Sequence, residues 1–158
     1  MKSREKEPRL RLIKHLMTLL YLMGFAIAGL DHRYGWSHVP LALVLIANAV
    51  VLASYLLIFR VFGENRYAAS TVEVEPGQTV ISTGPYALVR HPMYSAAMLM
   101  LLFTPLALGS YWALLAFVPL TLLIIPRLLN EEALLLHELP GYDEYCRKVR
   151  RRLIPRVW

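Results

Sequence analysis

The sequence predicts an all-α integral membrane protein with about four transmembrane helices. Hydrophobic residues make up 57% of the chain and the mean hydropathy is +0.46, above the values of ordinary soluble domains. Several apolar runs approach the length that a helix needs to cross a bilayer. The 158 residues suffice for one domain, so we treat 1–158 as a single membrane domain.

The expected spans follow one another with short connections at two of the three turns. A basic N-terminal segment precedes the first span, which we place at about 12–30. Pro40 opens the second span, at about 40–60, because a helix tolerates proline in its first turn. The third and fourth spans are expected at about 93–108 and 112–129.

The central loop, 61–92, is the longest polar region. Its residues alternate between polar and apolar on either side of Pro76-Gly77, which predicts a small hairpin or an extended loop. A connection of this length more often has a function than serves as a mere linker. The C-terminal segment, 130–158, begins as a helix and ends as a basic, aromatic tail typical of a membrane surface.

The positive charges predict the orientation. Of the 17 Lys and Arg residues, six lie in residues 1–15, three are Arg60, Arg66 and Arg90, and seven lie from Arg127 onward. The opposite side would hold only Arg33. The positive-inside rule therefore predicts that the N-terminus, the C-terminus and the central loop are all cytosolic. A nucleic-acid partner is not expected, because the charges cluster at the ends of apolar runs rather than along a soluble face.

Cysteine and histidine usage predicts no metal site. Cys146 is the single cysteine, so no intramolecular disulfide can form. No Cys/His spacing resembles a metal-binding motif.

The most restrained polar segment is Gly84-Pro85-Tyr86-Ala87-Leu88-Val89-Arg90-His91-Pro92-Met93-Tyr94. Each proline fixes its own φ and pushes its predecessor toward extended geometry. Arg90 presents a permanently charged fork suited to a carboxylate or phosphate, and His91 can donate or accept a proton near neutral pH. An anion site and a basic interfacial anchor explain the segment about equally well.

A second charged cluster follows the fourth span and shares its cytosolic face. Arg127 and Glu131 are four residues apart, so they can pair on one helix face. Glu132 points away from that pair and has no partner in its own helix. Carboxylates near hydrocarbon are costly and are usually paired or functional. Salt bridges to the basic tail explain the two glutamates slightly better than a ligand does, on composition alone.

Together these motifs resemble a known family. The pattern Gly84-Pro85-Tyr86…Arg90-His91-Pro92-x-Tyr94, then Glu131-Glu132, then Pro140-Gly141-Tyr142-x-x-Tyr145 is similar to the isoprenylcysteine carboxyl methyltransferase and phospholipid methyltransferase group of integral membrane enzymes. The resemblance covers roughly 60–158. It implies an S-adenosylmethionine cofactor in a cytosol-facing site built from the central loop and the C-terminal helix.

The resemblance also implies roles for individual residues. Arg90, His91 and Tyr94 would hold the methionine end of the cofactor, and Glu131 and Glu132 its ribose or amino group. The adenosine pocket or its lid would be formed by Tyr86, Tyr142 and Tyr145. Arg127 and Glu131 are the expected catalytic residues. Arg127 would hold a carboxylate acceptor, while Glu131 or His91 would assist proton loss from an amine.

The family's acceptors are lipophilic, so we expect a membrane-embedded carboxylate or amine as substrate. The chain resembles short prokaryotic-type members, which implies a bacterial or archaeal inner membrane. Longer relatives have additional N-terminal spans, so this chain is expected to be a minimal core or to form a homodimer.

Two alternatives remain open at this point. An NADPH-dependent membrane reductase related to sterol reductases would share Arg-His-Pro-x-Tyr and a tail like Tyr145-Cys146-Arg147-Lys148-Val149. The Glu131-Glu132 pair and the short chain favour methyl transfer instead. A non-enzymatic scaffold would explain the charges as topology signals and salt bridges, but it gives no reason for the restrained Arg-His-Pro turn.

Overall fold

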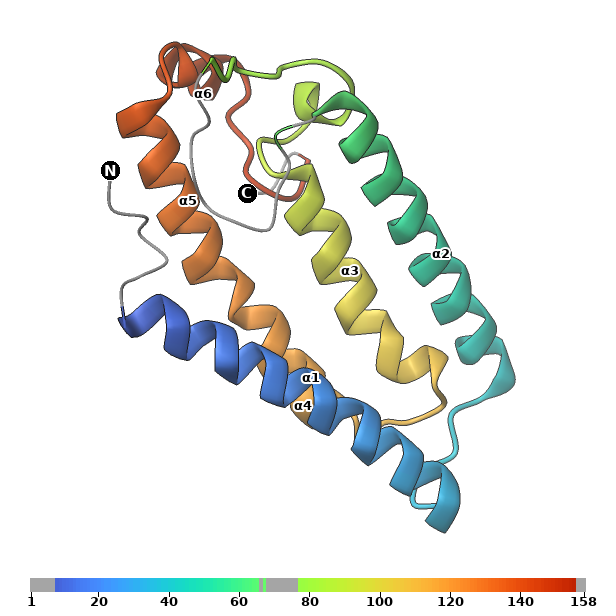
Figure 1. The fold of residues 1–158 in the computed structure, drawn as a ribbon. Helices are drawn as coiled ribbons and strands as arrows, with labels where there is room; N and C mark the ends of the chain where they lie inside the picture. Colours follow the sequence, from blue (N-terminus) through green and yellow to red (C-terminus); the bar gives the residue numbers. More distant parts are fainter. Residues whose placement is uncertain (1–7, 66, 68–76, 156–158) are drawn as a thin grey trace.

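A computed structural model describes residues 8–65, 67 and 77–155, and these residues form helices and loops without a β-strand (Figure 1). The elements are α1 (Pro8–Tyr34), α2 (Leu41–Glu64), the short 3₁₀ turn η2 (Gly84–Ala87), α3 (Pro92–Ala107), α4 (Leu114–Leu122), α5 (Ile124–Glu138) and α6 (Tyr142–Lys148). The all-helical prediction is therefore confirmed over the described residues.

Three helical stretches are long and apolar enough to cross a membrane: Arg11–Tyr34, Leu41–Glu64 and the continuous stretch Leu114–Glu138. The third apolar helix, α3, has 16 residues. At the usual rise per residue it is about 24 Å long, somewhat less than the thickness of the hydrocarbon core. Large apolar side chains on α1 and α2, such as Leu22 and Leu52, are exposed, as expected of a surface that lipid covers.

The helix ends differ from the expected spans in two places. α2 continues four residues past position 60, so the central loop begins at Asn65 instead of residue 61. Val61 explains this extra turn, because its side chain is fully buried. The stretch expected at 112–129 is divided at Leu123 into α4 and α5. Pro126 accounts for the division, since it cannot donate a backbone hydrogen bond to the carbonyl four residues earlier.

The central loop contains no strand in its described part. The first arm of the expected hairpin, 71–75, lies outside the described residues. The second arm, 78–82, has no regular secondary structure. The loop then tightens into η2 before α3 begins at Pro92.

Two pairs of helices form the bundle (Figure 1). α2 runs along α3, and α1 crosses α4. A core of buried apolar residues joins α1, α3, α4 and α5, and it consists of Ala28, Leu101, Ala113, Phe117, Leu120 and Ile124. The rings of Tyr21 and Phe25 on α1 meet Phe117 edge to face, with centroids 6.2 and 5.6 Å away.

A buried carboxylate connects the ends of α1 and α3. Asp31 is 1% exposed, and it accepts hydrogen bonds from the Ser37 N–H (2.7 Å), the Ser37 hydroxyl (2.6 Å) and the Ser110 hydroxyl. These contacts hold the α1–α2 and α3–α4 connections together. The Asn48 side chain of α2 donates to the Ala107 carbonyl at 3.3 Å, which joins α2 to the same end of α3.

The close approach of α1 and α4 predicts a large effect of one added methyl group. A Cβ at Gly24 would lie 2.4 Å from the buried ring of Phe117, whereas a Cβ at Gly29 would meet no atom within 4 Å. Gly24→Ala should therefore destabilise the protein by about 1–3 kcal/mol, the usual range for overpacking. Gly29→Ala is the matched control and should not. Thermal unfolding in detergent measures both, and equal melting temperatures for the two variants would contradict this helix contact.

Candidate functional site

The end of α2 holds the loop that carries Arg90 and His91. Gly84 has φ +55°, and a Cβ there would lie 2.6 Å from the Glu64 carboxylate. The Thr83 hydroxyl donates to the same carboxylate at 2.9 Å. Glycine is thus required at position 84 by both its backbone conformation and the nearby side chain. The turn η2 follows directly and directs the chain toward α3.

A segment near the C-terminus fixes the backbone of this loop. We call residues 151–153 the C-terminal strap. It accepts three hydrogen bonds: from the Arg90 N–H to the Arg151 carbonyl (2.8 Å), from the His91 N–H to the Arg152 carbonyl (2.9 Å), and from the Ser95 hydroxyl to the Leu153 carbonyl (2.6 Å). Leu153, the last residue of the strap, is buried. The Arg-His-Pro turn is therefore held from both sides.

Glu132 on α5 is the charged centre beneath this turn. Its carboxylate is 3% exposed and pairs with Arg90 Nη2 at 2.7 Å and with Arg152 Nε at 2.6 Å. His91 Nε2 lies 4.0 Å from it. One carboxylate thus connects the central loop, α5 and the C-terminal strap. Glu132 has no expected partner in its own helix, and in the structure its partners come from two other segments.

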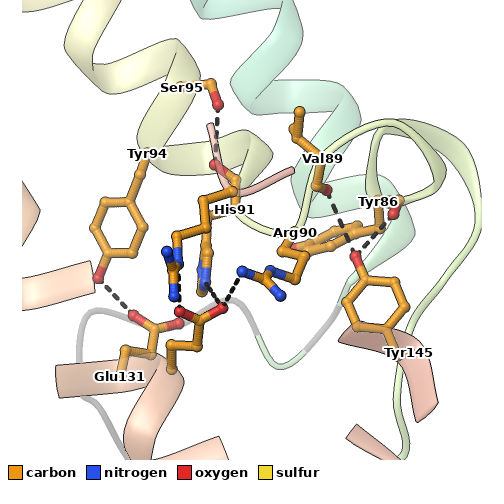
Figure 2. Close-up of polar contacts among 10 residues, drawn as sticks. Tyr86, Val89, Arg90, His91, Tyr94, Ser95, Glu131 and Tyr145 are labelled. Atoms are coloured by element: carbon orange, nitrogen blue, oxygen red, sulfur yellow. Dashed lines mark hydrogen bonds and ion pairs between the residues drawn. The ribbon is translucent and has the colours of Figure 1, made fainter. Parts of the chain in front are cut away.

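Glu131 faces a different set of groups. The Tyr94 hydroxyl donates to Glu131 Oε2 at 2.5 Å (Figure 2). Arg127 Nε donates to the same Tyr94 hydroxyl at 3.3 Å. Tyr94 is on α3, while Arg127 and Glu131 lie one turn apart on α5. The two helices therefore present a tyrosine, a carboxylate and a guanidinium to one another.

Three tyrosines form the opposite wall. The Tyr145 hydroxyl donates to the Tyr86 carbonyl at 2.7 Å (Figure 2), and Asn65 Nδ2 donates to the Tyr86 hydroxyl at 2.9 Å. Tyr142 stacks obliquely on Tyr145, with ring centroids 5.7 Å apart. Burial raises the pKa of Tyr86, Tyr142 and Tyr145, so all three stay neutral near physiological pH.

These side chains surround a cavity of about 310 Å³. Eight of the nine residues expected at the site line it: Tyr86, Arg90, His91, Tyr94, Arg127, Glu131, Tyr142 and Tyr145. Glu132 is the exception, because it lies behind Arg90 instead of facing the cavity. We expected Glu132 to contact a ligand, and its geometry instead gives it the part of holding Arg90.

One end of the cavity is polar and the other is apolar. Tyr94, Ala97 and Leu101 lie along one face of α3, at spacings of three and four residues. Helix α5 runs in the opposite direction (Figure 1) and likewise presents one face to the cavity, with Ile124, Arg127 and Glu131. Tyr94 thus lies opposite Glu131, and the apolar residues continue the cavity between the helices. Met17 of α1 closes this apolar arm.

The structure adds lining residues that sequence reasoning missed. Asn65, Tyr67 and Gln78 bring amide and phenol groups from the central loop to the cavity. Asn65 also accepts a hydrogen bond from the Tyr67 N–H at 3.0 Å. Asn65 and Tyr67 belong to Glu64-Asn65-Arg66-Tyr67, a stretch the family resemblance included without a role. Met17 carried no signal, because one methionine in an apolar helix looks like any lipid-facing residue.

The polar end of the cavity places a neutral imidazole beside a charged guanidinium. Burial, together with Arg90 and Arg152, lowers the pKa of His91 from its usual 6.5 to about 3, so the imidazole is neutral at physiological pH. Arg90 Nε and His91 Nε2 are buried and make no hydrogen bond with the described part of the chain. Arg90 and His91 both line the cavity, and a guanidinium and an imidazole suit a polar or anionic group of a ligand. Among the described residues, no three His, Cys, Asp or Glu side chains are placed to hold a metal ion.

One comparison with known proteins bears on this site. A family model described as phospholipid methyltransferase matches residues 36–139, well over half of the chain. The match runs from the start of the α1–α2 connection to the end of α5, and it includes Arg90, His91, Tyr94, Arg127 and Glu131. It confirms the resemblance that the motifs indicated. No curated protein sequence matches the chain.

The lowered pKa of His91 predicts a pH-dependent stability. Between about pH 6.5 and about pH 3 the unfolded chain binds a proton at this residue and the folded chain does not, so stability falls as the pH falls through this window. At about pH 5 the loss is about 2 kcal/mol. His91→Asn removes this titration, so between neutral pH and about pH 5 the wild type should lose more thermal stability than the variant.

The matched control is His137→Asn, which replaces an exposed histidine on α5. It should keep the wild-type dependence on pH. If the thermal stability of His91→Asn fell with pH as steeply as that of the wild type, the buried imidazole would not be the group that resists protonation.

Proposed function

This chain belongs to the phospholipid methyltransferase family, and from that premise we propose that it transfers methyl groups from S-adenosylmethionine to a lipophilic acceptor in the membrane. One observation carries the proposal. Side chains from the central loop, α3, α5 and α6 line a single cavity that is cationic and hydrogen-bonding at one end and apolar at the other. That combination suits a polar cofactor meeting an apolar substrate.

The polar end fits the parts of such a cofactor. S-adenosylmethionine, when bound, supplies a methyl group on a sulfonium that is already activated for displacement. Arg90 would bind the carboxylate of its amino-acid end as a fixed guanidinium fork, and His91 would add a neutral hydrogen bond. Glu131 would accept from its ammonium or ribose hydroxyl groups. Tyr86, Tyr142 and Tyr145 would enclose the adenosine.

The apolar arm fits the acceptor. Met17, Ala97, Leu101 and Ile124 would surround its hydrocarbon portion, and Arg127 lies where that arm meets the polar end. Catalysis of an in-line displacement then depends mainly on alignment, which the facing side chains of α3 and α5 would provide. Arg127 would hold an acceptor carboxylate. For an amine acceptor, Glu131 is the better proton acceptor, because the low pKa of His91 makes its imidazole a weak base.

We further propose that α3 crosses the membrane as a fourth, short span. With four spans, both termini and the central loop lie on one side, together with 16 of the 17 Lys and Arg residues. The positive-inside rule makes that side the cytosol, where the cofactor is available. A thinner local bilayer accommodates a helix of 16 residues at a modest cost.

Transfer of labelled methyl groups tests the proposal directly. Purified protein, incubated with methyl-labelled S-adenosylmethionine and a membrane lipid extract, should move label into the organic phase. The parallel reaction with NADPH and the same extract should oxidise no cofactor. NADPH oxidation without methyl transfer would favour a reductase, and no reaction from a folded protein that binds neither compound would favour a scaffold.

The same assay separates chemistry from cofactor binding at Arg127. Arg127→Gln removes the guanidinium next to Tyr94, so methyl transfer should fall by about tenfold or more while the affinity for S-adenosylhomocysteine changes little. Arg147→Gln is the control, because Arg147 is exposed on α6. Equal losses of turnover and affinity in Arg127→Gln would place this residue in the cofactor site.

A further inference from the structure

We propose that Arg152 is a positioning residue: its pairing with Glu132 leaves Arg90 free to bind the carboxylate of the cofactor. This inference rests on the proposed function, because it concerns the end of the cavity assigned to the amino-acid part of S-adenosylmethionine. Arg152 does not line the cavity, and it lies outside the stretch matched by the family model.

Glu132 is surrounded by more positive charge than it neutralises. Arg90 and Arg152 approach opposite oxygens of one carboxylate, at 2.7 and 2.6 Å. Two guanidinium groups and one carboxylate leave a net positive charge in this group. Without Arg152, the remaining pair would be neutral. The Arg90 and Glu132 side chains are only 10% and 4% exposed, so the difference is weakly screened by water.

Arg152 also influences how Arg90 meets the Glu132 carboxylate. Because Arg152 occupies Glu132 Oε2, Arg90 contacts the carboxylate through Nη2 and Oε1. Its Nε stays buried without a hydrogen bond to the described residues. Arginine and a carboxylate usually pair through two parallel hydrogen bonds when both oxygens are free. Loss of Arg152 would let Glu132 take Arg90 in that way and turn it from the cavity.

The backbone of the strap explains how Arg152 reaches this place. The carbonyls of Arg151 and Arg152 accept from the N–H groups of Arg90 and His91. The Arg152 side chain is therefore anchored beside the residues it influences, while about one third of it remains exposed. A positioning role predicts a selective effect on ligands that carry a carboxylate, and a purely structural role predicts loss of every ligand.

Calorimetric titration of the full chain in detergent tests this with two ligands. S-adenosylhomocysteine carries the amino-acid carboxylate, and 5′-methylthioadenosine shares the nucleoside but lacks the amino-acid part. Arg152→Gln should weaken the affinity for S-adenosylhomocysteine by about tenfold and leave the affinity for 5′-methylthioadenosine unchanged. Arg152→Lys keeps the charge and should retain most of the affinity. Arg150→Gln removes an exposed positive charge nearby and should bind both ligands like the wild type.

A second variant tests the charge count itself. Glu132→Gln combined with Arg152→Gln restores the net positive charge beside the cavity, so it should bind S-adenosylhomocysteine more tightly than Arg152→Gln alone. If Arg152→Gln lowered the affinity for both ligands equally, the strap would be only a structural support and the inference would be overturned. A still lower affinity for S-adenosylhomocysteine in the double variant would overturn it as well. Unchanged affinity in Arg152→Gln would overturn it too. A wild type that binds neither ligand would overturn the proposed function, and the inference with it.

Discussion

The carboxylate of Glu132 is the contact on which the arrangement of the site depends. It binds one arginine from the central loop and another from the C-terminal strap, and it lies on the helix that carries Arg127 and Glu131. Burial makes the loss of any partner costly, because the remaining charge would be left in a medium that solvates it poorly. Three segments distant in sequence are thereby held in one geometry. The cavity walls follow from that geometry, since Arg90 and His91 stand on the segment that Glu132 and the strap hold.

Much of the site could be predicted because its residues stand in short, recognisable motifs. Arg90, His91 and Tyr94 lie within five residues, and Arg127 and Glu131 follow the helical repeat. The distribution of positive charges predicts that both motifs lie on the same side of the membrane, where they can meet. Sequence could not distinguish the neighbouring glutamates. Glu131 faces the cavity and Glu132 faces the arginines, which depends on the rotation of α5 and on a strap twenty residues away.

The positions of the helices could be predicted from hydropathy. Their ends and the contacts between loops could not, because they depend on single side chains. The apolar runs predicted the helices, yet α2 extends to Glu64 because Val61 finds a buried place, which no hydropathy profile contains. In the sequence, Asp31 is a charged residue at the end of an apolar run, with no visible partner. In the structure it is buried and joins two connections, because serines at 37 and 110 come within reach of its carboxylate. Such pairings depend on segments far apart in sequence.

We propose that the central loop, α5 and α6 surround an S-adenosyl ligand. Amide hydrogen exchange of the protein in lipid nanodiscs, with and without S-adenosylhomocysteine, tests it most directly. The ligand should slow exchange in residues 84–94 and 131–145 and leave the distant connection 35–40 unchanged. Protection of these segments by NADPH instead, or no protection by S-adenosylhomocysteine, would show that the cavity is not an S-adenosyl site.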